Sequence, residues 1–148
     1  MTTQNDDPFQ LSRFVEAQAH VYPDVLAELN AGRKRTHWMW FVFPQIEGLG
    51  HSPTATFYAV KSVDETQAYL HHHLLGARLR ECTEILLNLT GRSLSEILGY
   101  PDDLKFCSSM TLFDAVASDN RLFGKAIDRY CEGRRDEKTL VRLSRWPG

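Results

Sequence analysis

Helix start and stop signals divide this chain into short segments, and most segments repeat their apolar residues at helical spacing. Asp7 and Pro8 form a pair typical of a helix start, and Pro23 can open a second helix. Ser62 and Ser93 each precede a glutamate by three residues, which is the spacing of a capping box. These signals predict a succession of short helices joined by short connections.

No stretch alternates polar and apolar residues over a strand's length, and the hairpin pairs Asn-Gly and Asp-Gly are absent from the sequence. The longest apolar stripe runs at helical spacing from Leu75 to Leu89. We therefore predict an all-α fold, a single compact domain over 1–148 with eight or nine short helices in non-bundle orthogonal packing. We expect frayed termini at 1–7 and 144–148.

A length of 148 residues fits one domain with one core. The formal net charge of −2 argues against a dedicated nucleic-acid binder, which usually carries a strong basic excess. No apolar run approaches the ~20 residues of a membrane span, and the polar N-terminus is not a secretory signal. We expect a cytoplasmic protein without a membrane partner; the oligomeric state stays open, with a monomer favoured.

The three cysteines, Cys82, Cys107 and Cys131, are odd in number and form no CxxC pair. Zinc-ribbon and thioredoxin-like sites therefore have no support. Cys82 and Cys131 lie in segments with helical periodicity, where small buried apolar residues are expected. The sequence predicts three free thiols and no disulfide, consistent with a reducing compartment.

The least ordinary segment is 36–52, which contains two of the three tryptophans and ends in a glycine-rich turn. As a helix or as a strand it would be apolar on all sides, so we expect Trp38 and Trp40 to be largely buried. Pro44 ends either element, and Gly48 and Gly50 permit unusual backbone conformations. The segment is either a core element with an ordinary turn or the wall and lip of a pocket.

His37 joins the basic triplet Arg33, Lys34 and Arg35 to this apolar run. An imidazole can act as acid, base or ligand, and burial tunes its pKa. A structural, hydrogen-bonded histidine is the alternative. The basic triplet is either a solvated turn or a contact for a phosphate or another anion at the pocket edge.

The segment 101–113 carries a second group of polar residues. Lys105 lies three and four residues before Ser108 and Ser109, so the three can share one helix face. A desolvated lysine could act as a base toward a hydroxyl, or the group could bind a phosphate or sugar. The alternative is that both serines are small residues at a tight helix crossing, bonded back to helix carbonyls.

Motifs for metals and nucleotides are absent from the sequence. Consecutive helical residues point ~100° apart, so His71, His72 and His73 cannot chelate one ion from a regular helix; we expect them at an exposed helix end. No HExxH, EF-hand, Walker A, GxGxxG or GxSxG pattern occurs. We predict no metal and no cofactor.

Three stretches identify a family resemblance: FVEAQ with the following VY at 14–22, GRKRTHWMWFVFPQIEGLGHS at 32–52 and PDDLKFCSSMTLF at 101–113. They resemble a small bacterial family of helical domains of unknown function, whose members are sometimes mislabelled calpastatin. The resemblance covers about 9–131 and implies an all-α single domain. It implies no reaction. Calpastatins are long disordered inhibitors, whereas this composition is globular.

The two strongest stretches of that resemblance are also the two with candidate chemistry. If they meet in space, they form an aromatic-walled pocket for a small anionic or nucleotide-like ligand. Its binding residues would be Arg35, His37, Trp38, Trp40, Gln45, Lys105, Ser108, Ser109 and Thr111. His37, Lys105 and Ser109 are the catalytic candidates if the ligand is turned over. The alternative is a non-catalytic interaction or regulatory domain in which these residues form the core.

Overall fold

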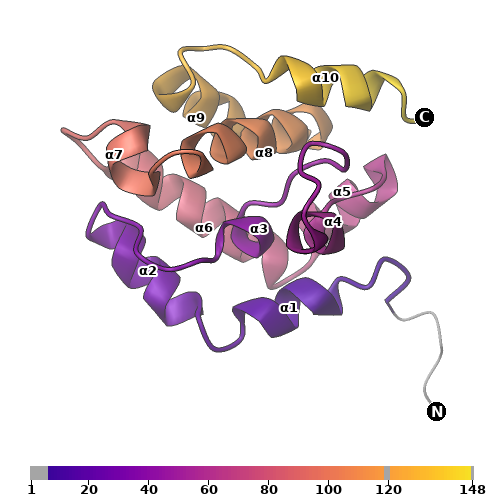
Figure 1. Cartoon of the computed structure of the whole chain (residues 1–148), viewed down its shortest axis with the longest axis horizontal. Coiled ribbons are helices and arrows are strands. Elements are labelled where there is room, and N and C mark those ends of the chain that lie inside the picture. Colours follow the sequence, from indigo (N-terminus) through magenta and orange to yellow (C-terminus); the bar gives the residue numbers. More distant parts are fainter. Residues whose placement is uncertain (1–6, 119–120, 148) are drawn as a thin grey trace.

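The computed structural model describes residues 7–118 and 121–147, and all regular secondary structure within them is helical. The described helices (Figure 1) are α1 (Ser12–Gln18), α2 (Tyr22–Asn30), α3 (Met39–Val42), α4 (Pro53–Tyr58), α5 (Val63–His71), α6 (Leu75–Asn88), α7 (Leu94–Leu98), α8 (Asp102–Val116), α9 (Leu122–Tyr130) and α10 (Glu137–Ser144). The all-α prediction is confirmed, with ten helices where eight or nine were expected. None of these helices combines the length and the apolar character that crossing a bilayer requires.

Helix α8 is the centre of the packing. It contacts α9, α10, α5, α7 and α3, and its Phe106, Met110 and Phe113 are fully buried. In Figure 1, α9 and α10 lie above α8, and α1 and α2 lie below α6. A helix with neighbours on so many sides shows little amphipathicity, which explains why polar and apolar residues are mixed in 101–113.

The helix ends follow the capping residues of the sequence. The side chains of Ser62, Ser93 and Asp136 accept hydrogen bonds from backbone N–H groups in the first turns of α5, α7 and α10, and Ser93 forms a complete capping box with Glu96. Pro23 lies in the first turn of α2, as predicted. Each cap satisfies an N–H group that the helix itself leaves without an acceptor.

The two ends of the described chain are anchored by specific contacts. The Asp7 carboxylate accepts from the backbone N–H groups of Leu11 and Ser12, so α1 begins later than the Asp7-Pro8 pair suggested. Trp146 packs against a small apolar cluster of Ile46, Val60 and Leu112. Most of the expected N-terminal fraying concerns residues 1–6, which lie outside the described residues, as does residue 148.

The aromatic segment 36–45 is not the single helix or strand expected from its composition. Only Met39–Val42 is helical, and Ile46 forms an isolated parallel bridge with Val60. Pro44 disfavours helical geometry at Phe43, which ends the helix there. Trp38 is buried with 1% exposure, as predicted, whereas Trp40 is partly buried.

The prediction of three free thiols is also wrong. Cys107 on α8 and Cys131 at the end of α9 form a disulfide with a Cα–Cα distance of 5.9 Å. Packing of α9 against α8 brings the two cysteines together across 24 residues, a proximity that local spacing cannot show. Cys82 is free, and its burial raises the pKa of its thiol to about 12. The cytoplasmic location rested partly on free thiols and stays a prediction.

Alkylation of denatured, non-reduced protein is expected to modify one cysteine, Cys82. The same treatment after reduction should modify all three, because Cys107 and Cys131 then react. Mass spectrometry of the intact chain counts the added groups. Three modified cysteines without reductant would contradict the disulfide.

Candidate functional site

The two sequence stretches singled out above meet in the structure. The rings of Phe43 and Phe106 pack edge to face with centroids 5.1 Å apart. Lys105 places its ammonium nitrogen 4.8 Å from the centroid of the Trp40 ring. The start of α8 and the segment around α3 therefore form one continuous surface, with an aromatic core beneath it.

One carboxylate joins two lysines on this surface. Asp102 Oδ2 lies 2.8 Å from Lys34 Nζ, and its Oδ1 lies 3.6 Å from Lys105 Nζ. Each lysine also lies over a tryptophan ring, Lys34 over Trp38 and Lys105 over Trp40. Two ammonium groups share one carboxylate, so the cluster retains a net positive charge, and cation–π contacts hold both amines in place.

Lys105 lines a groove of about 660 Å³. We call it the Lys105 groove. One wall is α8 with Leu104, Lys105 and Ser108, and the other is the chain from Tyr130 to Lys138. Both disulfide cysteines, together with Gln45 and Leu49, also line it. The side chain of Lys105 is 26% exposed, whereas that of Lys34 is 6% exposed, so Lys105 is the accessible amine of the pair.

The hydroxyl groups beside Lys105 have structural partners. Ser108 Oγ donates to the Leu104 carbonyl and to Asp136 Oδ2, at 3.2 and 3.1 Å. Thr111 Oγ1 donates to the Cys107 carbonyl and accepts from the Asp136 N–H at 2.8 Å. These bonds attach the start of α10 to α8 and fix the width of the groove. Ser108 and Thr111 therefore position its walls.

Ser109 differs from its neighbours. Its side chain is fully buried, and its hydroxyl oxygen has no hydrogen-bond partner among the described residues. It lies four residues after Lys105 on the same helix face, but the two side chains share no hydrogen bond or ion pair. The arrangement contains no lysine–serine pair of the kind needed for proton transfer.

The buried carboxylate of Glu28 organises the loop that precedes Trp38. Its Oε1 accepts from the backbone N–H of Arg35 and Thr36 and from Trp38 Nε1, at 2.7, 3.0 and 2.9 Å. Its Oε2 accepts from Thr36 Oγ1 at 2.7 Å. Burial raises the pKa of Glu28, but these hydrogen bonds outweigh it and hold the pKa at about 2.

The predicted site residues therefore divide into two groups. Trp40, Gln45, Lys105 and Ser108 lie at or beside the Lys105 groove, with Ser109 and Thr111 buried on α8. Trp38 is a core residue bonded to Glu28, and the side chains of Arg35 and His37 are exposed outside that groove. No described cavity brings His37 together with Lys105.

Sequence reasoning missed Glu28, Asp102 and the 130–138 wall. Glu28 lies in an ordinary amphipathic helix, and its role depends on a loop that folds back over it. Asp102 belongs to the segment 101–113 singled out above, but its ion pair with Lys34 depends on tertiary packing. Asp136 caps its own helix, but that local signal does not show that the segment 130–138 packs beside α8.

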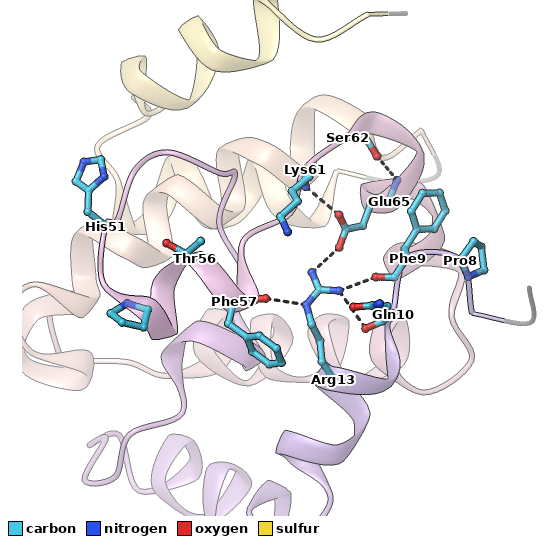
Figure 2. A pocket seen from close by; sticks show the side chains of 11 residues that line it. Pro8, Phe9, Gln10, Arg13, His51, Thr56, Phe57, Lys61, Ser62 and Glu65 are labelled. Carbon is cyan, nitrogen blue, oxygen red and sulfur yellow. Dashed lines mark hydrogen bonds and ion pairs between the residues drawn. The ribbon is translucent and has the colours of Figure 1, made fainter.

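A second cavity of about 700 Å³ lies around Arg13 (Figure 2). Arg13 uses all five of its N–H groups: Nε donates to the Phe57 carbonyl, Nη1 to the carbonyls of Phe9 and Gln10, and Nη2 to the Ala59 carbonyl and Glu65 Oε2. The Arg13–Glu65 pair is 2.6 Å apart, and both side chains are under 10% exposed. An arginine with every donor satisfied fastens loops together, so Arg13 itself has no free donor to offer a ligand in this cavity.

Metal-binding geometry is absent from the part of the chain that the structure describes. His72 Nδ1 accepts from the backbone N–H groups of Leu74 and Leu75, both at 3.1 Å. Burial and the neighbouring His73 lower the pKa of His72, which keeps the accepting nitrogen unprotonated. His72 therefore caps the start of α6.

The fold and the groove define a small helical domain with an open, polar groove. The chain belongs to the family described as protein of unknown function (DUF1810), whose model matches residues 8–143. It is similar to the crystal structure of the conserved hypothetical protein Rv1873 from Mycobacterium tuberculosis, with 55% sequence identity and a TM-score of 0.92. That match covers 93% of this chain and 99% of the other. No curated protein matches the chain.

Proposed function

We propose that this protein binds a small anionic organic ligand in the Lys105 groove, with the negative group of the ligand at Lys105 Nζ. The observation that carries the proposal is the sharing of Asp102 between two lysines. Lys34 has the shorter contact and is nearly buried, which leaves Lys105 as an under-compensated positive charge at the groove surface. An anion at this position gains a charge-assisted contact without separating a close ion pair.

The surroundings of Lys105 suit an organic ligand. Leu104 is 56% exposed and Tyr130 is partly exposed, so the groove presents apolar surface on both walls. Gln45 and the exposed Ser95 add polar side chains. The lining also includes charged side chains of both signs, so the groove combines apolar contact surface with polar groups that can orient an anionic ligand.

An interaction domain is the second candidate function. Trp38, Met39, Val42 and Phe43 belong to the main core, so much of the aromatic motif serves folding. Tyr100 is 77% exposed and Leu104, four residues later, is 56% exposed, so this end of α8 presents apolar surface that a protein partner could cover. In that case Lys105 contributes no ligand affinity.

A thermal-shift screen of anionic metabolites is expected to find a ligand that stabilises the protein. At a concentration 100 times its dissociation constant, the ligand should stabilise by ~2.7 kcal/mol. In Lys105→Met this stabilisation should be lost, because the substitution keeps the length of the side chain and removes its charge. The melting temperature of the variant without ligand reports whether it still folds.

Lys125→Met is the matched control, since Lys125 is exposed on α9 and does not line the groove. It makes the same change in net charge, so a general electrostatic effect would weaken binding in both variants alike. The proposal fails if a folded Lys105→Met protein binds the ligand as tightly as the unchanged chain does.

A further inference from the structure

The Lys105 groove continues into a second cavity of about 640 Å³ between the turn 48–51 and α10. Leu49, Asp136, Glu137 and Lys138 line both cavities, so the two form one continuous depression. We call the second part the basic cleft; its cationic and titratable residues are His51, Lys138, Arg142 and Arg145, together with the carboxylates of Asp136 and Glu137.

Two cations of the basic cleft lie on one face of α10, and a third follows directly after the end of that helix. Lys138, Arg142 and Arg145 are spaced by four and three residues, so their side chains lie one turn above another. The ion pairs of the described residues involve none of the three. Their charges therefore face the cleft without a bound carboxylate, in a chain whose net charge is −2.

Arg142 is held in place without using its donors. Its guanidinium lies directly against Gly48, where a Cβ on that residue would overlap it. It is partly buried, yet its side chain donates to no described acceptor. Arg13 is the opposite case, because all five of its N–H groups are occupied. An arginine that is ordered by packing but has unused donors is prepared to bind an anion.

The carboxylates of the cleft oppose an anion only weakly. Asp136 Oδ2 accepts hydrogen bonds from Ser108 Oγ, Thr139 Oγ1 and the Thr139 N–H, at 3.1, 2.5 and 3.1 Å. Its charge is therefore stabilised at the start of α10. Glu137 is exposed to solvent, where its charge is screened.

We infer that the basic cleft binds a phosphate or pyrophosphate group. The planar fork of Arg142 matches a phosphate, and three nearby cations suit a group with more than one negative charge. Combined with the proposed function, on which this step rests, the ligand is a phosphorylated organic molecule. Its phosphate lies in the basic cleft, and its organic part extends along the Lys105 groove.

Inorganic tripolyphosphate is the probe for the cleft alone. Isothermal titration at low ionic strength should show saturable binding to the unchanged protein that weakens as salt is added. Arg142→Met should weaken this binding by about tenfold or more, the usual effect of losing a hydrogen-bonded charge. Arg33→Met is the matched control, because Arg33 is exposed, is outside the cleft and carries the same charge; its affinity should stay within about twofold.

The inference is overturned if the unchanged protein does not bind tripolyphosphate, or if Arg142→Met and Arg33→Met weaken binding equally. If Arg142→Met does not fold, the exposed Arg145 directly after α10 replaces it, and Arg145→Met must weaken binding where Arg33→Met does not.

Lys105→Met separates the inference from the proposed function. Tripolyphosphate binding that survives Lys105→Met, together with loss of the screened organic ligand, supports both. Loss of the organic ligand in Lys105→Met without any tripolyphosphate binding leaves the proposed function standing and rejects the phosphate cleft. In a third outcome, tripolyphosphate binding depends on Arg142, but Lys105→Met binds the organic ligand as tightly as the unchanged chain does. That outcome rejects the proposed function and supports the phosphate site.

Discussion

Arg13→Gln is expected to lower the free energy of unfolding by roughly 3–5 kcal/mol, as for other broken buried ion pairs. Glu65 is 4% exposed, and without the guanidinium its carboxylate would be a buried charge lacking its partner. The carbonyl groups of Phe57 and Ala59 would also lose their donors, so the turn around α4 would detach from α1. Urea unfolding followed by circular dichroism measures the loss.

Arg33→Gln is the control for this substitution, because Arg33 is exposed and surface changes usually shift stability by less than about 0.5 kcal/mol. In the double variant Arg13→Gln with Glu65→Gln, part of the loss should be recovered, since no unpaired charge remains. A loss below about 1 kcal/mol for Arg13→Gln alone, well under the range for buried pairs, would show that the pair contributes little.

Glu28→Gln is expected to cost roughly 3 kcal/mol, the upper range for hydrogen bonds to a charged group. A glutamine offers one acceptor oxygen, and its NH₂ group would face N–H and O–H donors that now bind Oε1 and Oε2. The loop 35–38 and the buried Trp38 indole would lose their anchor. Tryptophan fluorescence during urea unfolding reports the change.

The pH dependence of stability tests the same carboxylate. The pKa of Glu28 falls from an ordinary value of 4.5 to about 2 in the folded protein. A carboxylate with a lowered pKa contributes stability that is fully present above pH 4.5 and is lost as pH falls from there toward 2. Glu28→Gln should therefore remove this part of the acid dependence. Glu84→Gln, at an exposed position on α6, should leave it in place; equal acid profiles for the unchanged chain and Glu28→Gln would contradict the assignment.

Helix starts could be predicted because their signals are local. Ser62, Ser93 and Asp136 act on N–H groups within three residues, so the sequence contains the whole interaction. The length of α3 was harder to predict. Its apolar residues suit any buried element, and the backbone N–H groups before it are bound by Glu28 from another helix.

The candidate site depends on pairs that only tertiary packing creates. The sequence singled out Lys105 and Trp40, but their contact arises where α8 crosses the segment around α3. His37 illustrates the opposite case: it adjoins the same motif, yet it is exposed, and the chain turns inward only at Trp38. Spacing cannot distinguish these outcomes, because neighbouring residues of an irregular segment can point to opposite sides.

The disulfide was missed for the same reason, since Cys107 and Cys131 belong to different helices. The three cysteines of the sequence form one pair and one buried thiol, and an odd number says nothing about which two pair. The interpretation of Cys82 and Cys131 as small buried apolar residues was correct for Cys82, which is fully buried on α6.

The bond between Cys107 and Cys131 also changes the topology of the chain, from an open string to a closed covalent ring with two tails. A single backbone cut inside the ring does not divide the molecule, because the pieces remain joined through sulfur. Both cysteines line the Lys105 groove, so the disulfide joins the two walls of the groove covalently. A nick between α8 and α9 would leave those walls tethered to each other until a reductant opened the ring.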